Sequence, residues 1–201
     1  MNSLKDSMAK ALAGGNTLTP SIKQSCNVKI ADVQLTTSQK GNPTIVMTLE
    51  RAGKVRETSK EYIRSSQVSY VYGQRRKIDL IGEICGAGTL GDKVITPVVP
   101  ITDEKGEIVE ISTDLKDEAL DAELDRLNEK YGTREYINFK DEETNEIHRC
   151  LMTVNSQAVP QYLESVTALL KKCIGKTMYA EVTGTDKKGY PKFSFTAPRT
   201  A

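Results

Sequence analysis

The stretch "TSQKGNPTIVMT" (37–48) returns about 150 residues later as "TDKKGYPKFSFT" (185–196), with Thr, Lys, Gly, Pro and the last Thr in register. Glycine can take the positive φ that a tight connection needs, and proline suits the first residue of the strand that follows it. The alternation of Ile45 and Met47 with polar residues has the period of a β-strand, and the second copy alternates in the same way. Each copy therefore predicts a β-hairpin.

The segments around the first turn also alternate. "NVKIADVQLTT" (27–37) alternates apart from one extra residue at Ala31 or Asp32, which predicts a β-bulge. "TIVMTLER" (44–51) is the returning strand, and "VRETSKEYIR" (55–64) is a third, more polar strand.

The second hairpin follows a helix. "VPQYLESVTALLKKCIG" (159–175) has Pro160 at a plausible helix start and Gly175 as C-cap. The order of the core is then strand, strand, strand, insertion, helix, strand, strand. This is the order of an OB-fold, a five-stranded closed barrel with its helix between strands three and four. We therefore expect a mainly β protein with helices, of the α+β class.

Three regions are expected: a flexible arm over 1–24, one domain over 25–201, and within it an acidic insertion over 66–157, between strand three and the helix. The insertion is patterned and predicts a short helix in "RRKIDLIGEIC" (75–85), hairpins in 100–112 and 137–154, and an acidic amphipathic helix in 113–131, ended by Gly132.

The net charge of +1 divides unevenly along the chain. Residues 1–100 carry +6, residues 101–157 carry −9 and residues 158–201 carry +4. A basic body interrupted by an acidic segment favours a phosphate-bearing partner. The alternative is that the charges only keep each segment soluble.

Two groups of side chains are candidates for binding that partner. In an OB-fold the loops after strands one and four flank the groove for oligonucleotides, and the repeated turns fall on those loops. Cations can neutralise a nucleic-acid backbone while tyrosine rings stack on unpaired bases. The candidates near the turns are Lys40, Lys187, Lys188, Tyr190 and Lys192, and those from the third strand onward are Lys54, Arg56, Tyr62, Arg64, Tyr70, Tyr72, Arg75, Arg76 and Lys77. The alternatives are ordinary solvated turns and tyrosines that belong to the core.

The sequence gives little support for dinucleotide binding, catalysis or metal binding. The G-x-G-x-x-G spacing of 86–91 follows a helix-like segment instead of a strand, so it predicts a helix-ending loop and not a dinucleotide site. The four cysteines lie far apart and His148 has no evident catalytic partner. We expect no enzyme, cofactor or metal site, with a metal-dependent nuclease as the minor alternative. Because no apolar run reaches the length of a membrane span or a secretion signal, we expect a cytoplasmic protein.

The segment "VKIADVQLTTSQKGNPTIVMTLE" (28–50) resembles the opening of phage-encoded single-stranded DNA-binding proteins of the OB-fold type. The resemblance covers 27–64 and, less clearly, 175–198. It implies sequence-independent coating of single-stranded DNA during phage DNA replication, recombination or repair, in the host-cell cytoplasm.

The sequence departs from that family in two ways. Many such proteins end in an acidic tail that recruits replication partners, whereas this chain ends "FTAPRTA" and has no tryptophan. The acidic segment 103–146 could recruit replication or recombination proteins instead. The alternative function is a structural or interaction protein, virion-associated or accessory to replication, that contacts proteins. The sequence does not indicate whether the protein prefers DNA or RNA, nor its oligomeric state.

Overall fold

A computed structural model describes residues 21–53, 57–186 and 189–200. Lys54, Arg56, Lys187 and Lys188, which the sequence assigns to the interface, lie outside the described residues, as do residues 1–20 of the predicted arm. The protein is α+β. Its described elements are β1 (Cys26–Thr37), β2 (Pro43–Arg51), β3 (Thr58–Arg64), α2 (Val68–Ile84), β4 (Val98–Pro100), α3 (Asp117–Tyr131), β5 (Tyr136–Lys140), β6 (Ile147–Val154), α4 (Val159–Lys171), β7 (Thr177–Thr185) and β8 (Pro191–Thr196).

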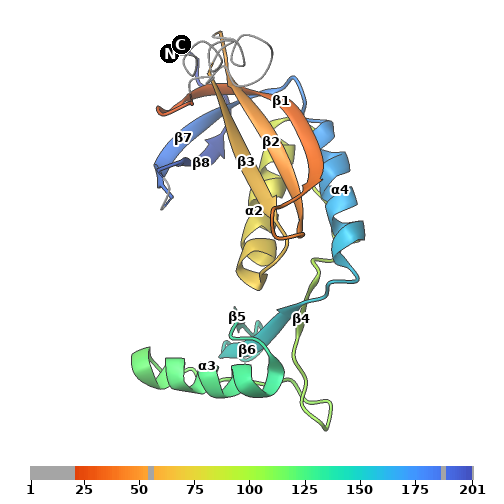
Figure 1. The fold of residues 1–201 in the computed structure, drawn as a ribbon, viewed down its shortest axis with the longest axis vertical. Coiled ribbons are helices and arrows are strands. Elements are labelled where there is room, and N and C mark those ends of the chain that lie inside the picture. The colour runs from red at the N-terminus through yellow and green to blue at the C-terminus, as the bar shows by residue number, and fades with distance from the viewer. Residues whose placement is uncertain (1–20, 54–56, 187–188, 201) are drawn as a thin grey trace, which may run out of the picture.

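Five strands form one antiparallel sheet in the order β3-β2-β1-β7-β8 (Figure 1). The first predicted hairpin is confirmed: Gly41 has φ +82°, and the Ser38 amide donates to the Asn42 carbonyl over 2.8 Å. The predicted bulge is confirmed as well, because the β1–β2 register shifts between Ile30 and Asp32. The bulge keeps Val33 on the same buried side of β1 as Val28 and Ile30.

The second predicted hairpin, β7–β8, is also confirmed. Gly189 has φ +80°, and the Asp186 carboxylate accepts a 2.9 Å hydrogen bond from the Tyr190 amide across the turn. Because β7 pairs only with the first four residues of β1, its turn lies beyond the start of β1, whereas the β1–β2 turn lies beyond its end. The two turns therefore stand at opposite ends of β1.

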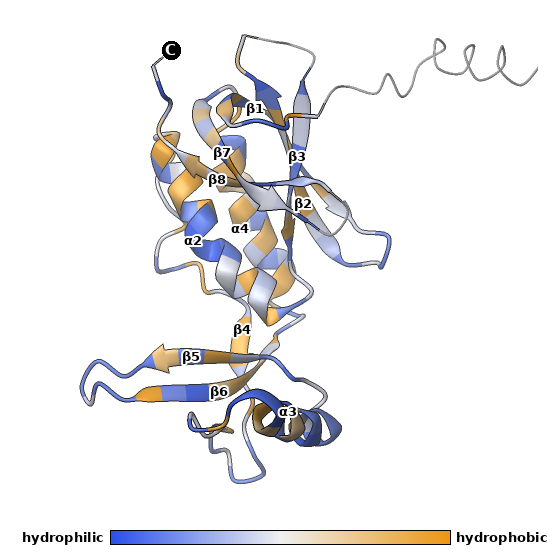
Figure 2. Ribbon diagram, turned by 90° about the vertical axis from the view of Figure 1, so that its left-hand side faces the viewer, coloured by the Kyte–Doolittle hydropathy of each residue, from blue (hydrophilic) through white to orange (hydrophobic). Residues whose placement is uncertain are grey.

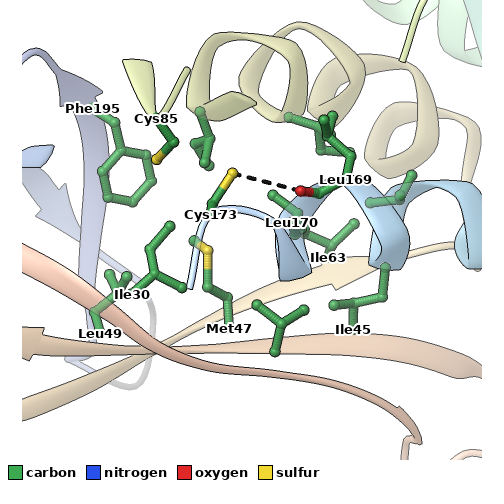
Figure 3. Close-up of a cluster of buried hydrophobic side chains, with 14 of the residues drawn as sticks. Ile30, Ile45, Met47, Leu49, Ile63, Cys85, Leu169, Leu170, Cys173 and Phe195 are labelled. Atoms are coloured by element: carbon green, nitrogen blue, oxygen red, sulfur yellow. Dashed lines mark hydrogen bonds between the residues drawn. The ribbon is translucent and has the colours of Figure 1, made fainter. Parts of the chain in front are cut away.

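The principal core lies between this sheet and the helices α2 and α4 (Figure 3). Met47 of β2 and Leu163 and Leu170 of α4 are fully buried in it. A helix is confirmed in the segment 159–175, but α4 ends at Lys171 with Lys172 as its C-cap, so the predicted cap at Gly175 is wrong. Gly175, with φ +83°, lies in the connection to β7 and donates to the Ile30 carbonyl over 2.8 Å. That bond ties the end of the helical segment to β1 at the bulge.

The predicted closed barrel is not found in the described residues, where β3 and β8 are the two edges of the sheet. The reason is α2, which contacts both edge strands. Its Lys77 forms an ion pair with Glu61 of β3, and the same ammonium lies 5.1 Å from the ring centroid of Phe195 of β8. The Gln74 side chain bonds the Arg64 amide (3.0 Å) and the Tyr62 carbonyl (3.2 Å), and so occupies edge groups that a closing strand would need.

The first helix of the insertion is longer than predicted. The sequence indicates a helix over 75–85, whereas α2 begins at Val68, and its buried residues include Val71, Ile78 and Ile81 of the principal core. The range 66–157 is therefore not one packing unit, because its first helix belongs to the same core as the sheet.

The rest of the insertion has its own small core. Strands β4, β6 and β5 form a three-stranded sheet, and α3 packs against it through Leu124 and Leu127, which meet Leu151 of β6 (Figure 2). The predicted hairpin at 137–154 and the acidic helix are confirmed, with Gly132 at φ +73° as C-cap. The hairpin predicted over 100–112 is a short turn. It is closed by backbone hydrogen bonds such as the one from the Val109 amide to the Ile101 carbonyl.

None of the helices in the described part of the chain has an apolar stretch long enough to cross a bilayer.

Candidate nucleic-acid interface

The outward face of β3, β2 and β1 presents the best candidate site. The helices α2 and α4 pack on the opposite side of these strands (Figure 1), so no helix in the described part of the chain covers this face. The strand registers place outward side chains in three rows across β3, β2 and β1: Lys60, Thr48 and Asp32; Tyr62, Val46 and Gln34; and Arg64, Thr44 and Thr36, of which Thr44 is buried. We call these nine residues the outward face.

Tyr62 is the aromatic ring at the centre of this set, and 44% of it is exposed. Lys60 and Arg64 flank it on the same strand at a spacing of two residues, roughly 6–7 Å on either side. Within the described residues, neither cation pairs with a carboxylate. The Arg64 guanidinium lies 5.4 Å from the ring centroid of Tyr70, and its Nη1 is 3.5 Å from the Tyr70 hydroxyl oxygen. One strand therefore offers an accessible ring between two uncompensated positive charges.

Two acidic side chains near this face already form an ion pair or hydrogen bonds. Lys29 and Glu50 form an ion pair at 3.4 Å. The Asp32 carboxylate accepts hydrogen bonds from the Val33 amide (2.8 Å) and the Gln34 side chain (2.6 Å). Glu50 is therefore paired with a cation, whereas Asp32 keeps its negative charge, so the outward face carries the two positive charges of Lys60 and Arg64 and the one negative charge of Asp32.

Two of the predicted cations have structural contacts instead. Arg75 donates to Asp79 (2.9 Å) and to the carbonyls of Val94 and Gly91, so it holds the glycine-containing loop against α2. Lys77 is paired with Glu61 between the sheet edges. Because their charged groups are already bonded inside the protein, we leave both out of the proposed interface.

The loop over 86–91 follows a helix, as the sequence predicts. Cys85 is the C-cap of α2, and the Ala87 amide returns to the Gly82 carbonyl at 2.8 Å. A Cβ on Gly82 would overlap the carbonyl oxygen of Gly88, so the glycine allows the loop to lie directly on the helix.

The remaining predicted residues are dispersed. Tyr72, 55% exposed, and Arg76 lie on the solvent side of α2, off the outward face. Lys40 is exposed in the β1–β2 turn, while Tyr190, 63% exposed, and Lys192 belong to the β7–β8 hairpin. The two turns are separated by about 16 residues along β1 and β7, which is a path of roughly 50 Å. Contact of these residues with nucleic acid stays a prediction.

Sequence reasoning missed the neutral part of the outward face, namely Gln34, Thr36, Thr44, Val46 and Thr48. The signal was present, because the hairpin turn and the bulge together fix which residues of β1 lie beside those of β2.

The most perturbed titratable groups lie in the core instead of on this face. Burial raises the pKa of Tyr162 to about 12, and its hydroxyl has no hydrogen-bond partner in the described structure. A hydrogen bond with Cys85 raises the pKa of the Cys173 thiol, which lies among core side chains (Figure 3). Within the described residues, no three His, Cys, Asp or Glu side chains gather in a way that could hold a metal ion.

No protein-family model and no curated protein matches this chain.

Proposed function

We propose that this protein binds single-stranded DNA without sequence specificity, along the outward face of β3, β2 and β1, and acts in phage DNA replication, recombination or repair. The observation that carries the proposal is Tyr62, an exposed ring between the unpaired cations Lys60 and Arg64. Single-stranded nucleic acid rewards this combination, because cations release counterions from the backbone and each stacked base contributes about 1–3 kcal/mol. A duplex, whose bases are already stacked, would gain only the electrostatic part.

The strand order supports the same proposal. We propose that β1, β2, β3, β7 and β8 form an OB-fold barrel that α2 holds open between β3 and β8. The sheet order, the bulge in β1 and the position of α4 before β7 fit this description. OB-folds bind oligonucleotides on the face of strands two and three, which corresponds to the face of Tyr62 here.

A direct test is fluorescence anisotropy of labelled oligo-dT, oligo-rU and a duplex, each at two salt concentrations. The proposal expects oligo-dT to bind best and its affinity to fall with salt, since phosphate contacts release counterions. A duplex that binds as tightly as oligo-dT at both salt concentrations would contradict a stacking site. Added Mg²⁺ or Mn²⁺ in the same assay would expose nuclease activity as shortening of the labelled strand.

The insertion supports a second candidate function, the recruitment of a protein partner. The α3 helix carries exposed acidic residues such as Glu118 and Glu129, and the nearby β5–β6 hairpin exposes Phe139 and Ile147. Acidic groups next to exposed apolar side chains suit a basic protein segment. Failure of all three oligonucleotides to bind at low salt would favour this function over nucleic-acid binding.

A further inference from the structure

A hollow of about 370 Å³ lies where the end of the five-stranded sheet meets the insertion. This volume falls within the range of small-molecule sites, roughly 300–1,000 Å³. The walls come from four places in the chain: the β1–β2 turn, the β3–α2 link, the residues around Glu135, and the segment from β6 into α4. The lining residues are Asn42, Pro43, Ser65, Ser66, Gly132, Thr133, Glu135, Thr153, Val154, Ser156, Val159 and Pro160.

The charge of the lining argues against a phosphate as the occupant. No lysine or arginine lines the hollow, and Glu135 is its single charged residue. That carboxylate accepts hydrogen bonds from the amides of Val68 (2.9 Å) and Ser69 (3.3 Å) at the first turn of α2. The positive end of the helix dipole offsets part of its negative charge. The hollow therefore suits an uncharged ligand better than an anionic one.

Some polar side chains in the lining already form hydrogen bonds, whereas others form none within the described structure. Ser65 donates to the Pro43 carbonyl (2.8 Å), and Thr133 donates to the Met152 carbonyl (3.1 Å). The side chains of Asn42, Ser66, Thr153 and Ser156 make no hydrogen bond within the described structure. These free donors and acceptors stand beside apolar walls from Pro43, Val154, Val159 and Pro160. A planar group with an apolar face and polar edges, such as a nucleobase, matches that arrangement.

The hollow lies at the end of the sheet, next to the last row of the outward face. Its Pro43 and Ser65 are the chain neighbours of Thr44 and Arg64, which form that row, and the alternation of a strand turns their side chains to the other side. A base would therefore enter the hollow around the end of the strands. We propose that the hollow receives one unstacked nucleobase of a strand bound along the outward face, with the backbone phosphates remaining outside near Arg64. This inference rests on the proposed function, and it names the base as the group recognised.

The test fills the hollow with a bulky side chain. Ser156→Trp places a ring in the lining, and Gln157→Trp places the same ring one residue further on, outside it. Both positions are exposed before α4, so the two variants are matched in their effect on folding, which thermal denaturation checks. We expect Ser156→Trp to weaken oligo-dT binding about tenfold, and Gln157→Trp to leave it within about twofold, because one base contact is lost in the first variant alone.

Abasic oligonucleotides identify the group that enters. In a series of dT strands with a single abasic nucleotide moved along the sequence, one position should weaken binding to the unaltered protein and have no effect on Ser156→Trp. If oligo-dT binds and the two Trp variants bind alike, the hollow is not a base site and the proposed function stands. If oligo-dT does not bind the unaltered protein, the proposed function itself fails.

Discussion

Replacing Tyr62 by leucine removes the stacking ring while keeping an apolar side chain beside Val46 of β2. Because Tyr62 is 44% exposed and points away from the core, the fold should lose at most about 1 kcal/mol. A base stacked on an aromatic side chain contributes about 1–3 kcal/mol, so the dissociation constant for oligo-dT should rise roughly 5- to 150-fold. Lys60 and Arg64 remain, and the salt dependence of binding should therefore be unchanged.

Tyr72→Leu is the matched control. Tyr72 is also an exposed tyrosine, but it lies on the solvent side of α2 and not on the outward face. Anisotropy titrations of both variants with one labelled oligo-dT, after urea denaturation has shown that both are folded, give the comparison. Equal losses in the two variants, or no loss in Tyr62→Leu, would refute the assignment of stacking to the face of β3, β2 and β1.

Three further predictions concern charge, packing and pH. Replacing Lys60 or Arg64 by glutamine should each reduce the slope of log K against log salt by about 0.7, measured by anisotropy at several salt concentrations. In α2, Gly82→Ala should destabilise the protein by about 1–3 kcal/mol because a Cβ there overlaps a carbonyl of the following loop, whereas Gly73→Ala, which meets open space, should stabilise it by about 0.5–1 kcal/mol in urea denaturation. The pKa of Tyr162 is near 12 in the folded protein and about 10 in the unfolded chain. The contribution of Tyr162 to the free energy of unfolding is therefore complete below about pH 10 and is lost as the pH rises to about 12. Tyr162→Phe should abolish this loss of about 2–3 kcal/mol when the free energy of unfolding is measured against pH.

The local features of the fold were predictable from the sequence because they depend on local chemistry. Gly41 and the C-cap Gly132 occupy positions that require positive φ, and the interruption at Ala31 and Asp32 is visible as a break in alternation. Such features predict turns, a cap and a bulge without knowledge of distant residues.

The start of α2 and the two free edges of the five-stranded sheet in the described residues were not predictable in this way. The segment "VSYVYG" (68–73) is rich in β-branched and aromatic residues and ends in glycine, so its local preference opposes the helix that it forms. Packing of Val68 and Val71 against buried neighbours outweighs that preference. In the described residues the five-stranded sheet does not close, α2 contacts both of its edge strands, and no local pattern reveals a contact between Gln74 and β3.

The candidate site was predictable only in part for the same reason. Lys77 and Arg75 look identical in sequence to cations that bind phosphate, but each has an internal partner, Glu61 and Asp79, respectively. Of these two, Asp79 lies one helical turn away and could have been noticed as an i, i+4 pair. Glu61 lies on another element, so only the tertiary structure identifies it.

Photo-cross-linking of a dT oligonucleotide that carries 5-iododeoxyuridine locates the bound bases, because the reactive base joins to the side chain on which it stacks. We expect cross-links to peptides of β3, β2 and β1, with Tyr62 as the principal site, and their loss in Tyr62→Leu. Cross-links confined to α3 or to the β5–β6 hairpin would contradict base binding on the outward face.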